Sequence, residues 1–265
     1  MIKFHKFHSQ YISRHIHKIY SLNHKENKPI SYNCLPSIYP ILTFLFNSEA
    51  TIMAKQVIIK PSSRAIQSLL ILPYSETLEV SNTGSTKEIS IVFKSFSLNC
   101  FVPLIKSGIT SDGLIDAQEL WHEDFKKLED QLVTKNISLD KQVDQIVAFL
   151  EKQFIDHNKT LGKENYSPQT IFESIKNLPE RSFYRKFKDL TYLAPKQFAK
   201  IIRIRKALNQ AKKDTNTKLT QIAYEQGYFD QAHFNRECQI FANTTPKKII
   251  MHMMDKDSDA LWYHD

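Results

Sequence analysis

Hydrophobic positions recur at different spacings in the two halves of this chain. Up to about residue 110, short β-branched or aromatic runs alternate with proline and turn residues, a pattern typical of strands. The runs cover residues 38–46, 56–59, 66–72 and 89–93, and the breaks fall at Pro61, Pro73 and the turn 81–85. Several short strands of this kind predict a sandwich or a small barrel.

Beyond residue 115 the apolar spacing becomes helical. Residues 117–133 and 139–154 are predicted to form two amphipathic helices, the second capped by Ser138. Their apolar stripes either seal one domain or pair with a second subunit. The stripes consist of Leu120, Trp121, Phe125, Leu128 and Leu132, and of Leu139, Val143, Ile146, Val147, Leu150 and Phe154.

The stretch 218–250 predicts a helix-turn-helix. Two short apolar stripes are separated by Gly227, which can adopt a positive φ where the chain reverses, and Asp230 is suited to cap the second helix. The stripes are formed by Leu219, Ile222 and Ala223, and by Phe234, Cys238 and Phe241.

The outward face of the second predicted helix carries Gln231, Ala232, His233, Asn235 and Arg236. Gln or Asn can pair bidentately with adenine, Arg with guanine, and Ala can touch a thymine methyl group. Gln231 and Arg236 are the favoured base readers, with a surface amide and a phosphate contact as their respective alternatives. Asn235 is equally compatible with base reading and with plain exposure, and His233 is expected to be a half-buried surface residue.

A family resemblance is carried by the run IAYEQGYFDQAHFNRE and the following TTPKKI. These residues resemble the second helix-turn-helix of AraC/XylS-family transcription regulators, which implies binding to double-stranded DNA. Two positions depart from the family pattern. Asn243 replaces a glycine, but Asn tolerates the left-handed conformation, so the turn is expected to persist. Cys238 replaces an aromatic residue and leaves a smaller core side chain.

A second segment, RSFYRKF followed by DLTYLAPKQFAKIIRIRKAL, resembles the first helix-turn-helix of the same family and the long helix after it. A helix over 168–176, capped by Ser167, precedes it. Phe183 and Phe187 are predicted to face the core. The outward residues Arg181, Tyr184 and Arg185 are candidate DNA contacts, whereas Lys186, Lys188 and Lys218 suit phosphate anchoring or solvation.

The first unit departs further from the family pattern, at Pro179, Tyr192 and Ala194. We therefore expect it to contribute less specificity than the second. The connector helix over 195–212 would extend about 27 Å at 1.5 Å per residue. That length is near the roughly 34 Å between successive major-groove faces, so one chain could read an asymmetric site.

The N-terminal half resembles, more diffusely, the N-terminal domain on one branch of the same family. The matching segments are LPSIYPILTFLF, IVFKSFSLNCF and DAQELW, in that order. In the wider family such a domain senses a ligand, mediates dimerisation, or does both. We place the β-rich domain and its two helices at 1–157, the DNA-binding domain at 158–252 and a flexible tail at 253–265, because 158–167 is polar.

Charge is concentrated in the C-terminal third. Residues 160–250 hold 17 of the 36 Lys+Arg and 8 of the 28 Asp+Glu, a net charge of +9, whereas the rest of the chain carries −1. A solvated basic surface would explain this charge alone. Beside the motif it favours phosphate contacts, because cationic side chains displace condensed counterions.

Other chemistries find little support. The cysteines Cys34, Cys100 and Cys238 lack CxxC spacing, which favours a reducing cytoplasm, and the 38–46 run is too short for a membrane span. His15 and His17 could share a strand face, but no further ligands accompany them, so neither a metal nor another cofactor is predicted. No glycine-rich phosphate loop is present.

The resulting hypothesis is an α+β protein that acts by binding and not by catalysis. A β-rich sandwich or barrel-like domain with two helices precedes two helix-turn-helix units joined by a long helix, in a sequence-specific regulator of the cytoplasm and nucleoid. RNA polymerase, a small-molecule effector and a second copy of the chain are the further partners considered. Two alternatives stay open: a ligand- or metal-binding enzyme domain with secondary DNA binding, and an interaction protein whose first unit no longer reads DNA.

Overall fold

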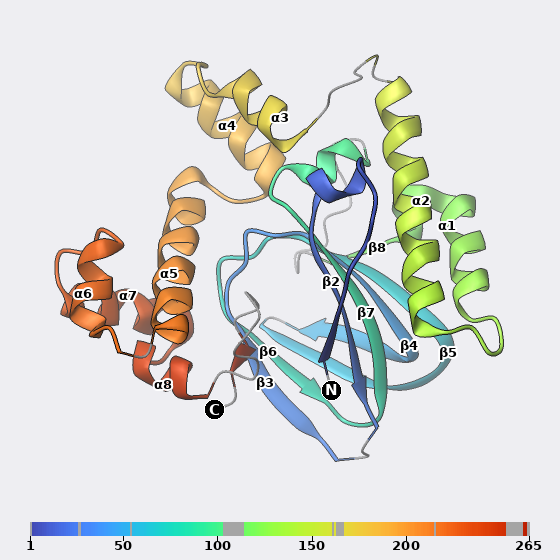
Figure 1. The fold of residues 1–265 in the computed structure, drawn as a ribbon, viewed down its shortest axis with the longest axis horizontal. Coiled ribbons are helices and arrows are strands. Elements are labelled where there is room, and N and C mark those ends of the chain that lie inside the picture. Colours follow the sequence, from blue (N-terminus) through green and yellow to red (C-terminus); the bar gives the residue numbers. More distant parts are fainter. Residues whose placement is uncertain are drawn as a thin grey trace.

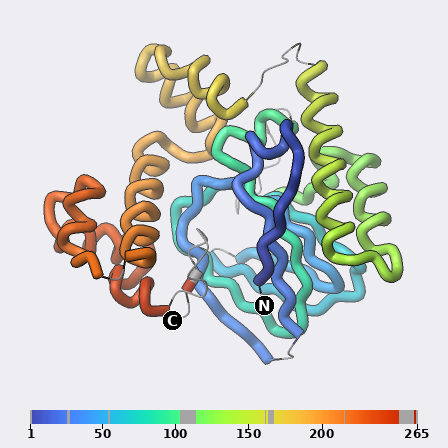
Figure 2. The backbone as a smooth tube through the Cα atoms, viewed as in Figure 1, coloured from blue at the N-terminus to red at the C-terminus, as the bar shows by residue number. Residues whose placement is uncertain are grey.

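The structure, a computed structural model, describes residues 2–25, 28–53, 55–102, 114–160, 162, 167–214, 216–252 and 262–263. A curled β-sheet with two long helices on one side is followed by a group of helices on the other side (Figure 1). The smooth backbone trace shows the same two parts (Figure 2). The predicted α+β class, with a β-rich N-terminal part and an all-helical C-terminal part, is confirmed.

Among the described residues, nine strands form one sheet in the order β1-β2-β7-β4-β5-β6-β3-β9, and β8 pairs with β5. Neighbours are antiparallel except β5 and β6. The sheet curls into a half-barrel and is not a sandwich of two sheets. The strands are β1 (Ile2–His5), β2 (Ile16–His24), β3 (Ile30–Cys34), β4 (Ile41–Met53), β5 (Gln56–Ile71), β6 (Leu78–Asn82), β7 (Thr86–Phe93), β8 (Leu114–Asp116) and β9 (Trp262–Tyr263).

The predicted break at Pro61 is wrong, because this proline lies inside the single long strand β5. Pro61 is opposite Ser48, next to a register shift in β4 that interrupts regular pairing. Such irregularities are where a strand tolerates the missing N–H of proline. The segments predicted at 56–59 and 66–72 therefore belong to one strand.

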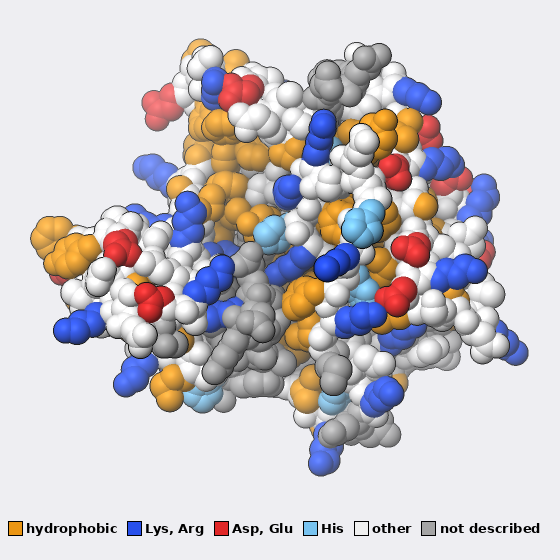
Figure 3. All heavy atoms as spheres, viewed as in Figure 1, with side chains coloured by type: hydrophobic (Ala, Val, Ile, Leu, Met, Phe, Trp, Pro, Cys, Tyr) orange, Lys and Arg blue, Asp and Glu red, His pale blue; other side chains and the backbone are white. Residues whose placement is uncertain are grey.

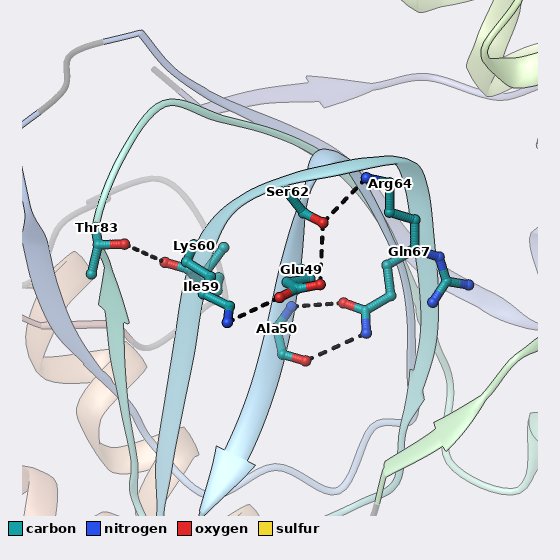
Figure 4. Close-up of polar contacts among 8 residues, drawn as sticks. All are labelled: Glu49, Ala50, Ile59, Lys60, Ser62, Arg64, Gln67 and Thr83. Atoms are coloured by element: carbon teal, nitrogen blue, oxygen red, sulfur yellow. Dashed lines mark hydrogen bonds and ion pairs between the residues drawn. The ribbon is translucent and has the colours of Figure 1, made fainter.

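Side chains hold this irregular part of the β4–β5 pair together (Figure 4). The Gln67 Oε1 accepts a hydrogen bond from the Ala50 N–H at 2.6 Å, and its Nε2 donates to the Ala50 carbonyl oxygen at 3.4 Å. Glu49 forms an ion pair with Lys60 at 3.0 Å and accepts a hydrogen bond from Ser62 at 3.1 Å. These bonds join the two strands across the break in the ladder.

The two faces of the sheet have different surroundings because side chains alternate along a strand. On β4, Leu42 and Phe44 face the helices α1 (Gln118–Leu132) and α2 (Leu139–Thr160), where the Phe44 ring lies 5.7 Å from that of Phe125. Thr43 and Leu45 alternate with them and line a cavity on the inner face. Both predicted helices are confirmed, and α2 continues past the domain boundary placed at 157.

The C-terminal part contains two short helical units joined by one long helix. Ser167 caps the first helix as predicted, accepting a hydrogen bond from the Thr170 N–H at 3.2 Å. Of the predicted polar linker 158–167, residues 158–160 form the end of α2, and residues 161 and 163–166 lie outside the described residues. The helices are α3 (Pro168–Ile175), α4 (Glu180–Thr191), α5 (Pro195–Lys213), α6 (Leu219–Glu225), α7 (Gln231–Ala242) and α8 (Pro246–Met251).

One contact between the two parts surrounds Phe96, which follows β7. Its ring lies 5.5 Å from Phe187 of α4 and 6.2 Å from Phe198 of α5. The Asn99 amide donates to the Leu190 carbonyl oxygen at 2.9 Å. The first helical unit is therefore packed directly against the β-rich part.

A second contact ties the sheet to the end of α7. The Tyr263 side chain on β9 is 2% exposed, and its hydroxyl donates to the Ala242 carbonyl oxygen at 2.8 Å. β9 pairs with β3, so it connects the sheet to the second helical unit. For Trp262 and Tyr263 this differs from the predicted flexible tail, because both the strand pairing and the buried ring require tertiary contacts. The other residues of the tail lie outside the described part of the chain.

Candidate nucleic-acid interface

The second helical unit is built as its apolar pattern predicts. Phe234 and Cys238 of α7 are fully buried in one cluster with Ile222 of α6. The ring centres of Tyr228 and Phe234 lie 4.9 Å apart. The thiol at position 238 is thus accommodated within the core of the unit. This packing leaves the opposite face of α7 free to carry polar side chains.

The predicted turn and caps of this unit are confirmed. Gly227 has a φ of 78°, and the Asp230 carboxylate accepts a hydrogen bond from the His233 N–H at 2.6 Å. Asn243 ends α7 in the left-handed conformation with a φ of 53°. These residues define where the helix begins and ends, and so which side chains it presents.

Replacing Asp230 by alanine is expected to lower the free energy of unfolding by about 1 kcal/mol, because the first turn of α7 loses its capping acceptor. Urea denaturation of the full chain measures this change. Asp230→Asn keeps an acceptor oxygen and is the matched control, expected to lose only a few tenths of a kcal/mol. Equal losses in both variants would show that the cap is not the cause.

An ion pair fixes α7 to the connector helix α5. Arg203 donates to both carboxylate oxygens of Glu237 at 2.9 Å, and its guanidinium lies 4.7 Å from the ring centre of Tyr228. Burial, and to a lesser extent the Glu237 charge, raises the pKa of Tyr228 far above its usual range, so the phenol stays neutral. This pair could not be predicted from the sequence, because the two charged residues are separated by a turn and a helix and share no local spacing.

The outward face of α7 presents the residues that the sequence analysis selected. Ala232 and Arg236 are exposed, whereas Gln231 and Asn235 are half-buried. The Thr220 hydroxyl of α6 donates to the Gln231 Oε1 at 2.6 Å, a contact that the sequence analysis missed. The amide NH₂ group remains a donor, and the carbonyl oxygen has a second lone pair, so Gln231 is held without losing its capacity for base-edge hydrogen bonds.

The first helical unit also turns its charged face outward. Phe187 is buried and Phe183 half-buried, as predicted, whereas Arg181, Tyr184 and Arg185 are exposed. Tyr192 ends α4 with a φ of 62°, a left-handed conformation that is costly for a bulky residue. Lys186 and Lys188 are exposed on the same helix, and Lys218 is exposed at the start of α6.

The connector α5 places the two units at its opposite ends (Figure 1). Its 19 residues span about 28 Å at 1.5 Å per residue. Lys and Arg side chains outnumber acidic ones over the C-terminal helices on the face shown in Figure 3. The arrangement offers two separated, basic, helical surfaces on one chain.

The two histidines considered for a metal site have separate surroundings. His15 is 1% exposed and packs against Phe101 and Phe154, at ring distances of 5.5 and 4.6 Å, whereas the His17 ring stacks on Tyr39. Within the described ranges, no three His, Cys, Asp or Glu side chains are grouped so as to hold a metal ion. Nor does any described helix have the length and apolar character needed to cross a membrane.

A cavity of about 100 Å³ lies on the inner face of the curled sheet. Most of its lining is aliphatic, and Glu88 of β7 is the acidic residue within it. Burial raises the pKa of this carboxyl group, and hydrogen bonds from Ser90 and Tyr20 oppose that effect. Burial also raises the pKa of Cys34, which keeps that thiol protonated and unreactive.

Comparisons with known proteins identify the helical part. Residues 175–250 match the family model of a helix-turn-helix domain of the AraC type. The match confirms the resemblance of this segment to AraC-type helix-turn-helix domains that its motifs predicted.

Solved structures of ToxT from Vibrio cholerae are similar to most of the chain at low identity. A structure of its P21 crystal form is 15% identical, covers 88% of this chain and 98% of that chain, and has a TM-score of 0.39. A structure of ToxT bound to an unsaturated fatty acid is 13% identical, covers 88% of this chain and 95% of that chain, and has a TM-score of 0.40. A search among curated proteins finds no match.

Proposed function

We propose that this protein is a sequence-specific DNA-binding transcription regulator that inserts α4 and α7 into successive major grooves. The supporting observation is the placement of two helices at the two ends of the connector α5, of which α4 exposes a basic face and α7 exposes Arg236 among amide side chains. A major groove admits one α-helix, and grooves on one side of a duplex recur about every 34 Å. The protein acts by binding in the cytoplasm, on chromosomal DNA, and not by catalysis.

The second unit carries most of the proposed sequence reading. Arg236 suits guanine and Gln231 suits adenine, while Ala232 and Asn235 contact neighbouring base edges. In the first unit, Arg181, Tyr184 and Arg185 contact bases or backbone. Phosphate contacts are assigned to the exposed amines Lys186, Lys188 and Lys218.

Selection of bound sequences from random DNA at two salt concentrations tests this function. We expect enrichment of an asymmetric site with two parts about one helical turn apart, and weaker binding at the higher salt concentration. The double variant Gln231→Ala/Arg236→Ala should lose the enrichment of one part only. Recovery of no preferred sequence by the folded wild-type chain would contradict the proposal.

The variant Arg236→Ala is expected to weaken binding to the selected site by about 1–3 kcal/mol, with relaxed preference at one base position. The reason is the loss of a bidentate donor to the base edge. Binding titrations against the selected site and its single-base variants measure both quantities. Arg14→Ala, which removes an exposed arginine from the β-rich part, is the control and should bind normally. A uniform loss across all sequences would instead assign Arg236 to phosphate.

The β-rich part is proposed to regulate DNA occupancy through a small-molecule effector bound on the inner face of the sheet. Cys34 lines the cavity and lies opposite Trp262 in the β3–β9 strand pair. The adjacent Tyr263 donates a hydrogen bond to the Ala242 carbonyl oxygen at the end of α7. Arg205 of α5 also donates to the Pro36 carbonyl oxygen, at 2.8 Å. The cavity wall is therefore connected to the DNA-binding helices. Contact with RNA polymerase and pairing of two chains stay predictions.

A further inference from the structure

The inner face of the sheet places one carboxyl group in apolar surroundings. Glu88 and Ser90 alternate on β7 with Ile89 and Ile91, which face the opposite side of the sheet toward the helices. On the neighbouring strands, Leu22 and Leu45 are the residues directly opposite Glu88. The carboxyl group therefore lies within the aliphatic part of the cavity and not at its solvent edge.

Glu88 is 7% exposed and lacks a cationic partner among the described residues. Its carboxylate accepts a hydrogen bond from the Ser90 hydroxyl. The adjacent Lys87 faces the other side of the sheet, where its amine lies 4.6 Å from the ring centre of Phe46 and donates to Gln142 at 2.7 Å. A buried carboxyl group without a counter-ion is costly to ionise, so a cation entering the cavity would remove a large part of that cost.

Three tyrosines, Tyr20, Tyr32 and Tyr74, line the same cavity. The Tyr20 hydroxyl donates a hydrogen bond to the Glu88 carboxylate, and the Glu88 charge contributes to the raised pKa of Tyr32. Burial raises the pKa of all three phenols far above their usual range, so the rings carry no charge. Neutral aromatic rings around a site attract a cation through their π-electrons, and such cages recognise substituted ammonium groups.

We propose that the cavity binds a small apolar amine, with Glu88 as its counter-ion and the rings of Tyr20 and Tyr32 beside its ammonium group. The inference rests on the proposed function in that this amine would be the effector of the regulator. The aliphatic lining selects a short apolar body, and a volume of about 100 Å³ limits its size. An engineered apolar cavity of about 150 Å³ holds benzene, so this smaller cavity suits a short alkyl chain and not a substituted ring. The positive charge of Arg205 acts on Tyr74, so the ammonium group is placed on the Glu88 side of the cavity, where an anionic ligand would meet the carboxyl group.

Calorimetric titration of the chain with propylamine, 1-propanol and propionate tests the proposal. The three probes have the same three-carbon skeleton and differ in charge. We expect saturable binding of propylamine, weaker binding of 1-propanol and no binding of propionate. Glu88→Gln should weaken propylamine binding by about tenfold or more while leaving 1-propanol binding nearly unchanged. The control Glu79→Gln removes a carboxylate that accepts a hydrogen bond from Gln56 on β5, and it should bind propylamine normally.

Two results would overturn the proposal: propionate binding as tightly as propylamine, or unchanged propylamine binding in folded Glu88→Gln. Circular dichroism establishes whether that variant is folded. If it is not, Tyr32→Leu decides, because removing this ring should weaken propylamine binding more than 1-propanol binding, and equal weakening would refute the proposal. DNA selection without amine is scored separately. Selected sequences without amine binding would refute this inference alone, whereas amine binding without any DNA preference would refute the regulator function.

Discussion

Replacing Phe234 by alanine is expected to lower the free energy of unfolding of the helical part by about 3–5 kcal/mol and to abolish specific DNA binding. The Phe234 ring is fully buried and packs beside Tyr228 in the core that joins α6 to α7. Its removal leaves a cavity that the surrounding side chains can fill only in part. Because the position of α7 depends on this core, the outward residues of that helix would lose their fixed geometry.

Chemical denaturation followed by circular dichroism measures the loss, and DNA titration measures its consequence. The matched control is Ile240→Ala on the same helix, where the side chain is 74% exposed. This control should change the free energy of unfolding by no more than about 0.5 kcal/mol. Similar losses in the two variants would contradict the assignment of Phe234 to the core and Ile240 to the surface.

Acidification from pH 6.5 to pH 4 is expected to remove about 3 kcal/mol of stability through His15 alone. Burial, together with the positive charges of Lys94 and Arg14, lowers the pKa of this imidazole from 6.5 to about 4. Between these values the unfolded chain binds a proton at His15 and the folded chain does not. Protonation of His15 therefore leaves the free energy of unfolding unchanged above pH 6.5 and lowers it progressively as the pH falls toward the pKa of the folded state.

The measurement is the free energy of unfolding against pH for wild type and His15→Phe. Phenylalanine suits the aromatic surroundings formed by Phe101 and Phe154 and removes the titrating group. The slope between pH 6.5 and 4 should be shallower in the variant, whatever other groups contribute. His8→Gln, a change at an exposed histidine, should keep the wild-type slope. A variant slope equal to that of wild type would contradict the prediction.

The helical elements could be predicted closely because their signals are local. Apolar spacing, the caps Ser167 and Asp230 and the turn at Gly227 lie within a few residues of the helices that they define. The strands were less predictable. β1, β2, β3 and β6 were not predicted, because their sequences mix polar and apolar residues, and neither were the short strands β8 and β9. β5 was divided at Pro61, since the irregularity that accommodates this proline depends on its partner strand.

In the candidate interface, too, features set by nearby residues could be predicted, whereas contacts between residues far apart in the chain could not. The outward positions of α7 follow from helical spacing alone, so Gln231 and Arg236 could be selected from the sequence. The residues that hold this helix in place could not, because Arg203 meets Glu237 and Thr220 meets Gln231 only after the chain has folded.

By itself, the sequence determined the helix-turn-helix units, the polar side chains on their outward faces and the β-rich nature of the N-terminal part. These properties depend on residue type and short spacing. Only the tertiary structure decided that the sheet curls around a cavity, that Glu88 and three tyrosines meet within it, and that Tyr263 joins the sheet to α7. Strand order and register bring together residues far apart in the chain, and no local pattern encodes which strands become neighbours.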